Sequence, residues 1–160
     1  MERAFPLTRL GFASAAALLV AGCGAAPDPT PEALHKHQHT PPHGGTPVEL
    51  GREEYHVELV RDPSAGRLTA YVMDGELEGF VRVPATALVM TAKVGGVGET
   101  LTLQPVANPA TGEKVGDTSQ FEGTADWLKT ADTFDGSFQE LAIKGRTFRD
   151  VRFNFPKGNE

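Results

Sequence analysis

Residues 55–73 read Tyr-His-Val-Glu-Leu-Val-Arg-Asp-Pro-Ser-Ala-Gly-Arg-Leu-Thr-Ala-Tyr-Val-Met, and this stretch decides the fold. Its first part alternates: Tyr55, Val57 and Leu59 fall on one face of an extended chain, and His56 and Glu58 fall on the other. Residues 61–66 contain the Asp, Pro, Ser and Gly typical of turns, and residues 67–73 return to strand-forming types. The stretch therefore predicts a β-hairpin with a medium-length loop.

Further short strands are predicted along the rest of the chain, at residues 80–83, 87–94, 100–106, 138–143 and 146–155. The apolar side chains of the last segment change from even to odd numbering, so a bulge or kink is expected near Arg149 and Asp150. A single helical turn is expected at residues 125–129, with Thr124 as its N-cap. Seven or eight short strands without a long amphipathic helix predict an all-β fold, an immunoglobulin-like antiparallel β-sandwich, over residues 47–157.

The composition limits the classes of function. The 160 residues carry a formal net charge of −6, which argues against nucleic acid as a partner because nucleic-acid binding needs a basic surface. The sequence contains no G-x-S-x-G, P-loop or H-E-x-x-H motif, so an enzyme is not predicted. The single cysteine excludes an internal disulfide and a zinc site built from several thiolates.

The first 22 residues predict an export signal. Arg3 and Arg9 precede or flank an apolar run over residues 10–20, which is too short for the roughly 20 apolar residues of a membrane-spanning helix. The run ends in Leu19-Val20-Ala21-Gly22-Cys23, which resembles the lipobox of bacterial lipoproteins. The resemblance implies cleavage before Cys23, acylation of that residue with fatty acids such as palmitate, and attachment to an envelope membrane. Gly24 after the cysteine favours the periplasmic side of the outer membrane over the inner membrane. The alternative is an ordinary signal peptide with an incidental cysteine.

Residues 23–46 have no apolar periodicity and are rich in proline, which predicts a flexible tether. The tether contains His35, His37, His39 and His43, a density of histidine typical of metal-binding segments. Neutral imidazole suits Cu, Zn and Ni, and the sequence does not select among them. The alternatives are a solvated spacer that tolerates histidine and a segment that becomes cationic as the pH falls.

One histidine, His56, lies in a predicted strand beside Glu58. Most strand histidines of this kind are surface residues without a function. The functional interpretation makes His56 and Glu58 adjacent metal ligands, joined by His43 because Gly44 and Gly45 would let the chain fold back.

The segment from His43 to Asp74 resembles the N-terminal module of periplasmic adaptor proteins in heavy-metal efflux systems, and also small envelope lipoproteins of uncharacterised role. The resemblance rests on three features: a histidine-bearing segment, the strand Tyr55-His56-Val57-Glu58-Leu59, and a partner strand that ends in Asp74. The resemblance implies metal contacts at His43, His56 and Glu58. Nothing after Asp74 resembles the coiled hairpin or lipoyl-like segments of an adaptor.

Two functions are therefore expected as alternatives. The first is a membrane-anchored envelope lipoprotein that binds a transition metal through its histidine tether, as a buffer or as an accessory to an efflux system. The second is a lipid-tethered β-sandwich that binds another envelope protein or a glycan and has no metal role.

Overall fold

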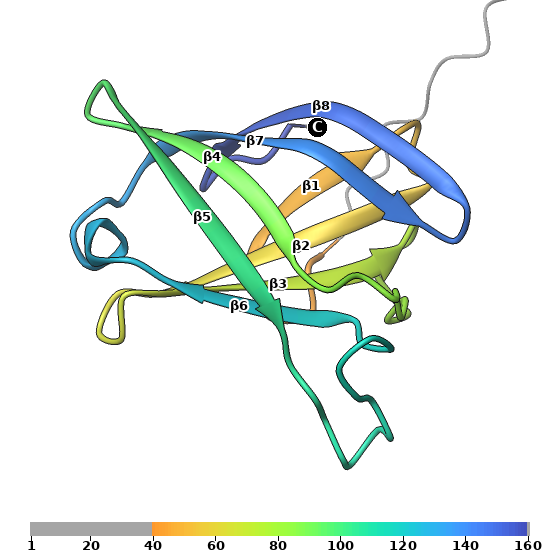
Figure 1. Ribbon diagram of the computed structural model, residues 1–160. Coiled ribbons are helices and arrows are strands. Elements are labelled where there is room, and N and C mark those ends of the chain that lie inside the picture. The colour runs from red at the N-terminus through yellow and green to blue at the C-terminus, as the bar shows by residue number, and fades with distance from the viewer. Residues whose placement is uncertain (1–39, 160) are drawn as a thin grey trace, which may run out of the picture. The chain divides into compact units, whose positions relative to one another are not determined.

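The computed structural model describes residues 40–159 of the chain, so Cys23, His35, His37 and His39 lie outside the described residues. The described part contains eight strands and one 3₁₀ turn (Figure 1). The strands are β1 (Thr46–Leu50), β2 (Tyr55–Asp62), β3 (Arg67–Asp74), β4 (Leu88–Val94), β5 (Val97–Pro105), β6 (Gln120–Thr124), β7 (Phe134–Ile143) and β8 (Arg146–Phe155); the 3₁₀ turn η1 is Asp126–Lys129.

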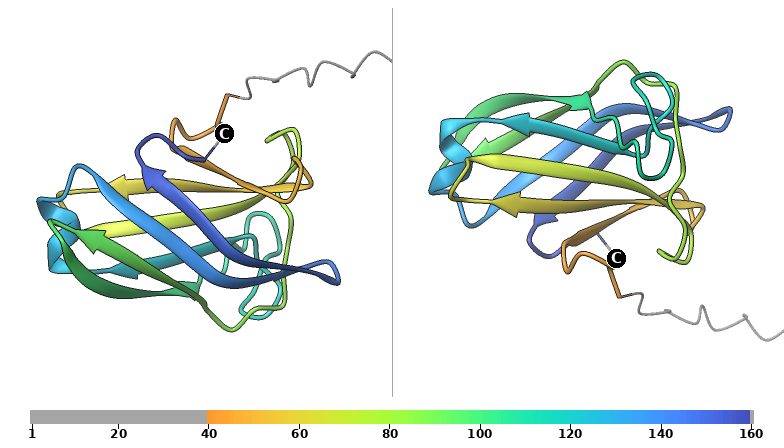
Figure 2. Two further views of the ribbon diagram at one scale, coloured as in Figure 1. Left: turned by 90° about the horizontal axis from the view of Figure 1, so that it is seen from above. Right: turned by 90° about the horizontal axis from the view of Figure 1, so that it is seen from below.

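All the strands join one antiparallel sheet in the order β1-β2-β3-β6-β5-β4-β7-β8. The predicted hairpin is confirmed as β2 and β3, which pair from Tyr55↔Asp74 to Asp62↔Arg67. The sheet curls until it is nearly barrel-shaped (Figures 1 and 2). The prediction of an all-β antiparallel fold is confirmed.

The core fills the inside of the curled sheet. Alternate residues of each strand point inward, among them Val57 and Leu59 of β2, Phe121 of β6 and Phe138 of β7, all of which are 0% exposed. Phe121 and Phe138 are among the largest fully buried side chains. Burial of this apolar surface is the main force that closes the sheet.

The predicted kink is confirmed in β8, where Asp150 adopts a positive φ of 52°. Strand β7 changes phase opposite this kink. The inward residues Phe134 and Phe138 have even numbers, whereas the inward residue Leu141, further along the strand, has an odd number. The pairing runs from Phe134↔Phe155 to Ile143↔Arg146 without an inserted residue. The two strands therefore switch faces together, and the apolar residues on both sides of the kink remain buried.

Three local features differ from the prediction. Strands β1 and β6 were not predicted, and residues 80–83 make only isolated bridges, Met73↔Phe80 and Val83↔Thr118. The N-cap of η1 is Ala125 rather than Thr124, without a side-chain hydrogen bond. Both missed strands have five residues, and each contains a residue type that is rare in strands, Pro47 in β1 and Gly123 in β6.

The edge of β1 is covered by the end of the chain. The side-chain amide of Asn159 accepts a hydrogen bond from the backbone N of Glu49 (2.7 Å) and donates one to its carbonyl O (3.1 Å). Gly158 approaches β1 so closely that a Cβ there would lie 2.3 Å from the carbonyl O of Pro47. One side chain thus takes the place of a neighbouring strand at this edge. Across residues 40–159, no helix is both long enough and apolar enough to span a membrane.

Candidate functional site

His43 folds back onto β2 and contacts Glu58, as the glycines that follow it suggested. The His43 Nδ1 lies 2.7 Å from Oε2 of Glu58. The other carboxylate oxygen, Oε1, accepts hydrogen bonds from the backbone N–H groups of His43 and Gly45, both at 2.9 Å. Glu58 is 0% exposed, so a buried carboxylate holds the segment through three contacts.

The two glycines explain how the chain reaches this position. Gly44 has a φ of +66°, a left-handed conformation in which glycine avoids the strain of a side chain. At Gly45 a Cβ would lie 2.6 Å from the carbonyl O of Leu59 and 2.8 Å from Cγ of Glu58. Only a residue without a side chain therefore lets the backbone approach β2 closely enough to donate to Glu58.

Aromatic side chains fix the plane of the His43 ring. The ring stacks on Tyr71 of β3 with a centroid distance of 3.9 Å and an interplanar angle of 8°. Phe80 lies 5.8 Å away in a tilted arrangement and is 52% exposed. Tyr71 is the cross-strand neighbour of Glu58, so the ring that stacks and the carboxylate that binds come from adjacent strands.

The electrostatic surroundings keep Tyr71 protonated. Burial raises the pKa of its phenol, and the negative charges of Glu122 and Glu58 raise it further, against a smaller opposite effect of Arg67. Tyr71 therefore acts here as a neutral aromatic platform and not as a phenolate ligand.

The hydrogen bonds also indicate which nitrogen of His43 is available. A carboxylate accepts hydrogen bonds, so the proton is assigned to Nδ1. Within residues 40–159, Nε2 has no hydrogen-bond partner, and the side chain is 32% exposed. Histidines that bind metals commonly have this arrangement, because a carboxylate on one nitrogen orients the ring and makes the other nitrogen more basic.

His56 lies on the same face of β2, two residues before Glu58, but it is fully buried. Its Nδ1 lies 3.3 Å from the carbonyl O of Asp74, at the end of β3. Met73, its cross-strand neighbour, is also buried, and so is Leu77 in the loop after β3. His56 is thus buried in the strand, and it is not a surface residue.

The structure brings together two of the predicted site residues, His43 and Glu58. Among residues 40–159, no group of three His, Cys, Asp or Glu side chains is placed to hold a metal ion. Tyr71 and Phe80 also belong to this site and were not predicted as parts of it. The alternation in residues 67–73 placed Tyr71 on a strand, but only the pairing with β2 puts it under His43.

Comparisons of the chain with protein-family models, with curated proteins and with solved structures gave no match.

Proposed function

We propose that this chain is an exported lipoprotein, held on the envelope membrane through Cys23, whose histidines bind Cu, Zn or Ni. It would buffer the metal or serve as an accessory to efflux, without catalysis. The observation that carries the proposal is the 2.7 Å contact between His43 Nδ1 and the buried carboxylate of Glu58. This contact orients the ring and leaves Nε2 as the nitrogen that can bind a metal.

The remaining ligands of this proposed site are His35, His37 and His39, which precede His43 closely in the chain. Zn and Cu sites commonly combine two to four such nitrogens at about 2 Å from the metal. Because the sequence predicts a flexible tether, binding at such a site would cost chain entropy, and this cost would lower the affinity. One ligand that is already fixed reduces this cost. In this proposal Glu58 orients His43 and His56 is buried in the fold, so neither binds the metal directly.

Metal titration of the soluble chain without residues 1–23 tests the proposal. We expect Zn²⁺ or Cu²⁺ to bind with a Kd of about 1–10 µM, and we expect His43→Ala to weaken binding by roughly tenfold or more. The triple change of His35, His37 and His39 to alanine should abolish binding in the same range. A matched control changes Lys36 and Gln38, in the same segment, to alanine and should leave the Kd unchanged. Binding no tighter than millimolar in the starting protein would show that the metal proposal is wrong.

Membrane attachment has a separate test. Cys23→Ser removes the thiol that would carry the lipid, so the protein should move from the membrane pellet to the soluble fraction. Fractionation with immunoblotting, together with the mass of the mature chain, measures this. A Cys23→Ser protein that still pellets with membranes at the same processed mass contradicts the lipid anchor.

The finer description of the fold, an immunoglobulin-like sandwich, is also kept as a proposal. Its support is the weak link between two halves of the sheet. Strands β5 and β6 pair only at Gln104↔Glu122 and Pro105↔Phe121, whereas β4 and β5 pair along their length from Leu88↔Leu103 to Val94↔Val97. The halves β1-β2-β3-β6 and β5-β4-β7-β8 would then be the two sheets, and they face each other across the core.

A further inference from the structure

A groove of about 700 Å³ crosses the second half of the sheet, formed by strands other than those of the His43 site. Two rows of outward-facing residues cross it from strand to strand. One row is Gly98, Lys93, Asp135 and Asn154, and the other is Thr91, Ser137 and Arg152. The alternate residues Gly136 and Phe153 point to the core instead and are buried.

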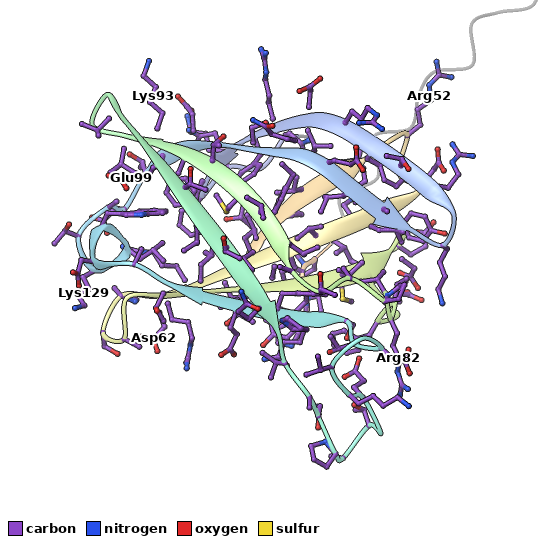
Figure 3. The ribbon with its side chains drawn as sticks, viewed as in Figure 1. Arg52, Asp62, Arg82, Lys93, Glu99 and Lys129 are labelled. Carbon is purple, nitrogen blue, oxygen red and sulfur yellow. The ribbon has the colours of Figure 1, made fainter. Side chains whose placement is uncertain are left out.

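The groove is open on the side of β5, because Gly98 has no side chain there. A Cβ built on Gly98 meets no atom within 4 Å, and Gly98 does not have a positive φ, so the space above it is empty. Thr91 and Ser137 add only short side chains to the floor. Lys93 projects from β4 away from the sheet (Figure 3), and the exposed Arg152 lies on β8. The groove therefore has a low floor with a cation on either side.

These two cations are not neutralised within the part of the chain that the structure describes. Lys93 pairs with Asp135 in the strand register but forms no ion pair with it, and Arg152 likewise has no ion-pair partner among residues 40–159. Asp135 instead accepts a hydrogen bond from Asn154 Nδ2 at 2.9 Å. Five other arginines of the described chain form ion pairs with acids, and Arg52, like Arg152, does not; the five are Arg61, Arg67, Arg82, Arg146 and Arg149. On a protein with a formal net charge of −6, the groove is a local site for negative charge.

We propose that this groove binds an acidic saccharide, a sugar chain that carries carboxylates. Hydroxyl, amide and carboxylate side chains such as Ser137, Asn154 and Asp135 are suited to sugar hydroxyls, because together they donate and accept hydrogen bonds. A bare inorganic anion would gain nothing from Asp135, and a neutral sugar would leave both cations without a partner. Lys93 and Arg152 lie two strand spacings across the sheet and two residues along it from each other, so their Cα atoms are about 12 Å apart. This separation fits two carboxylates on successive sugars better than a single one.

The chemistry also predicts weak binding. No aromatic ring is exposed along the groove for a sugar to stack on, since Phe153 is only 5% exposed. Affinity therefore comes from hydrogen bonds and from charge, for which a Kd on the order of 0.1–1 mM is reasonable. Because the cations are exposed, added salt should weaken the binding. The groove shares no residue with the proposed metal site.

The test is a titration of the full-length chain in neutral detergent, followed by backbone amide NMR. The probes are trigalacturonate and its fully methyl-esterified form, which has the same hydroxyls without the charge. We expect shifts in β4, β7 and β8 with the acid only. Arg152→Gln should weaken binding about fivefold or more, since hydrogen bonds to charged groups are the stronger ones. Gly98→Leu should abolish it by filling the groove, and the control Lys114→Gln, a cation outside the groove, should leave it unchanged.

Three results would overturn the proposal. The first is the absence of saturable shifts with trigalacturonate. The second is equal binding of the methyl ester, which would remove the role of the cations. The third is inorganic phosphate that binds as tightly as the trisaccharide and competes with it fully, because the groove would then be a simple anion site.

Discussion

Replacing Glu58 with alanine should lower the free energy of unfolding by about 3–4 kcal/mol. The carboxylate is completely buried and accepts from two backbone N–H groups and the His43 ring. Without it, either those donors remain buried without an acceptor, or the segment from His43 to Gly45 detaches and exposes the outer face of β2 and β3. Both outcomes are costly. Denaturant unfolding followed by circular dichroism measures the change.

The control for this experiment is Glu78→Ala, an exposed glutamate in the loop after β3 whose side chain is not part of the site. It should change the free energy of unfolding by no more than about 0.5 kcal/mol. Glu58→Gln adds a second readout, because the amide preserves the size but offers a donor where an acceptor is needed. We expect it to weaken metal binding by about tenfold or more through loss of the His43 orientation. A Glu58→Ala variant as stable as the starting protein would contradict the structural role of Glu58. A Glu58→Gln variant with unchanged metal affinity would contradict its role in orienting His43.

Gly45→Ala should have the second largest effect, a loss of about 2–3 kcal/mol. The added methyl group would lie 2.6 Å from the carbonyl O of Leu59 and 2.8 Å from Cγ2 of Val60. Backbone cannot move aside as a flexible side chain can, so either the segment that carries His43 or strand β2 must shift. The shift also lengthens the hydrogen bond from Gly45 N to Glu58. Thermal unfolding, together with the NMR signal of the His43 ring, reports both effects.

Gly98→Ala is the matched control, because its Cβ meets no atom within 4 Å and its backbone does not have a positive φ. Its stability should stay within about 0.5 kcal/mol of the starting protein. If Gly45→Ala behaved like Gly98→Ala, the close approach of the segment to β2 would not be needed for stability.

The fold was predictable in its longer strands, β2 and β3 of eight residues and β8 of ten. β2, β3 and the kink at Asp150 all followed from the positions of apolar side chains. The pairing order was not predictable, because β6 inserts between β3 and β5 through contacts distant in sequence. A period-two pattern gives the face of each residue but not its neighbouring strand.

The site was predictable in part for the same reason. Gly44 and Gly45 indicated that His43 could return to β2, and the alternation placed Glu58 and His56 on one face. The burial of His56 could not be foreseen, because an alternating pattern gives the face of a residue but not what packs against that face. The stacking of His43 on Tyr71 likewise required the register of β2 against β3.

The contact between Glu49 and Asn159 has a consequence for the order of folding. The two residues are 110 positions apart, yet one side chain pairs with the edge of the first strand. A chain that is made from its N-terminus presents β1 long before Asn159, and in that interval the free strand edge could pair with another molecule. Contacts of such long range also slow folding. Asn159 can thus protect the edge of β1 only after the strands between them have been made.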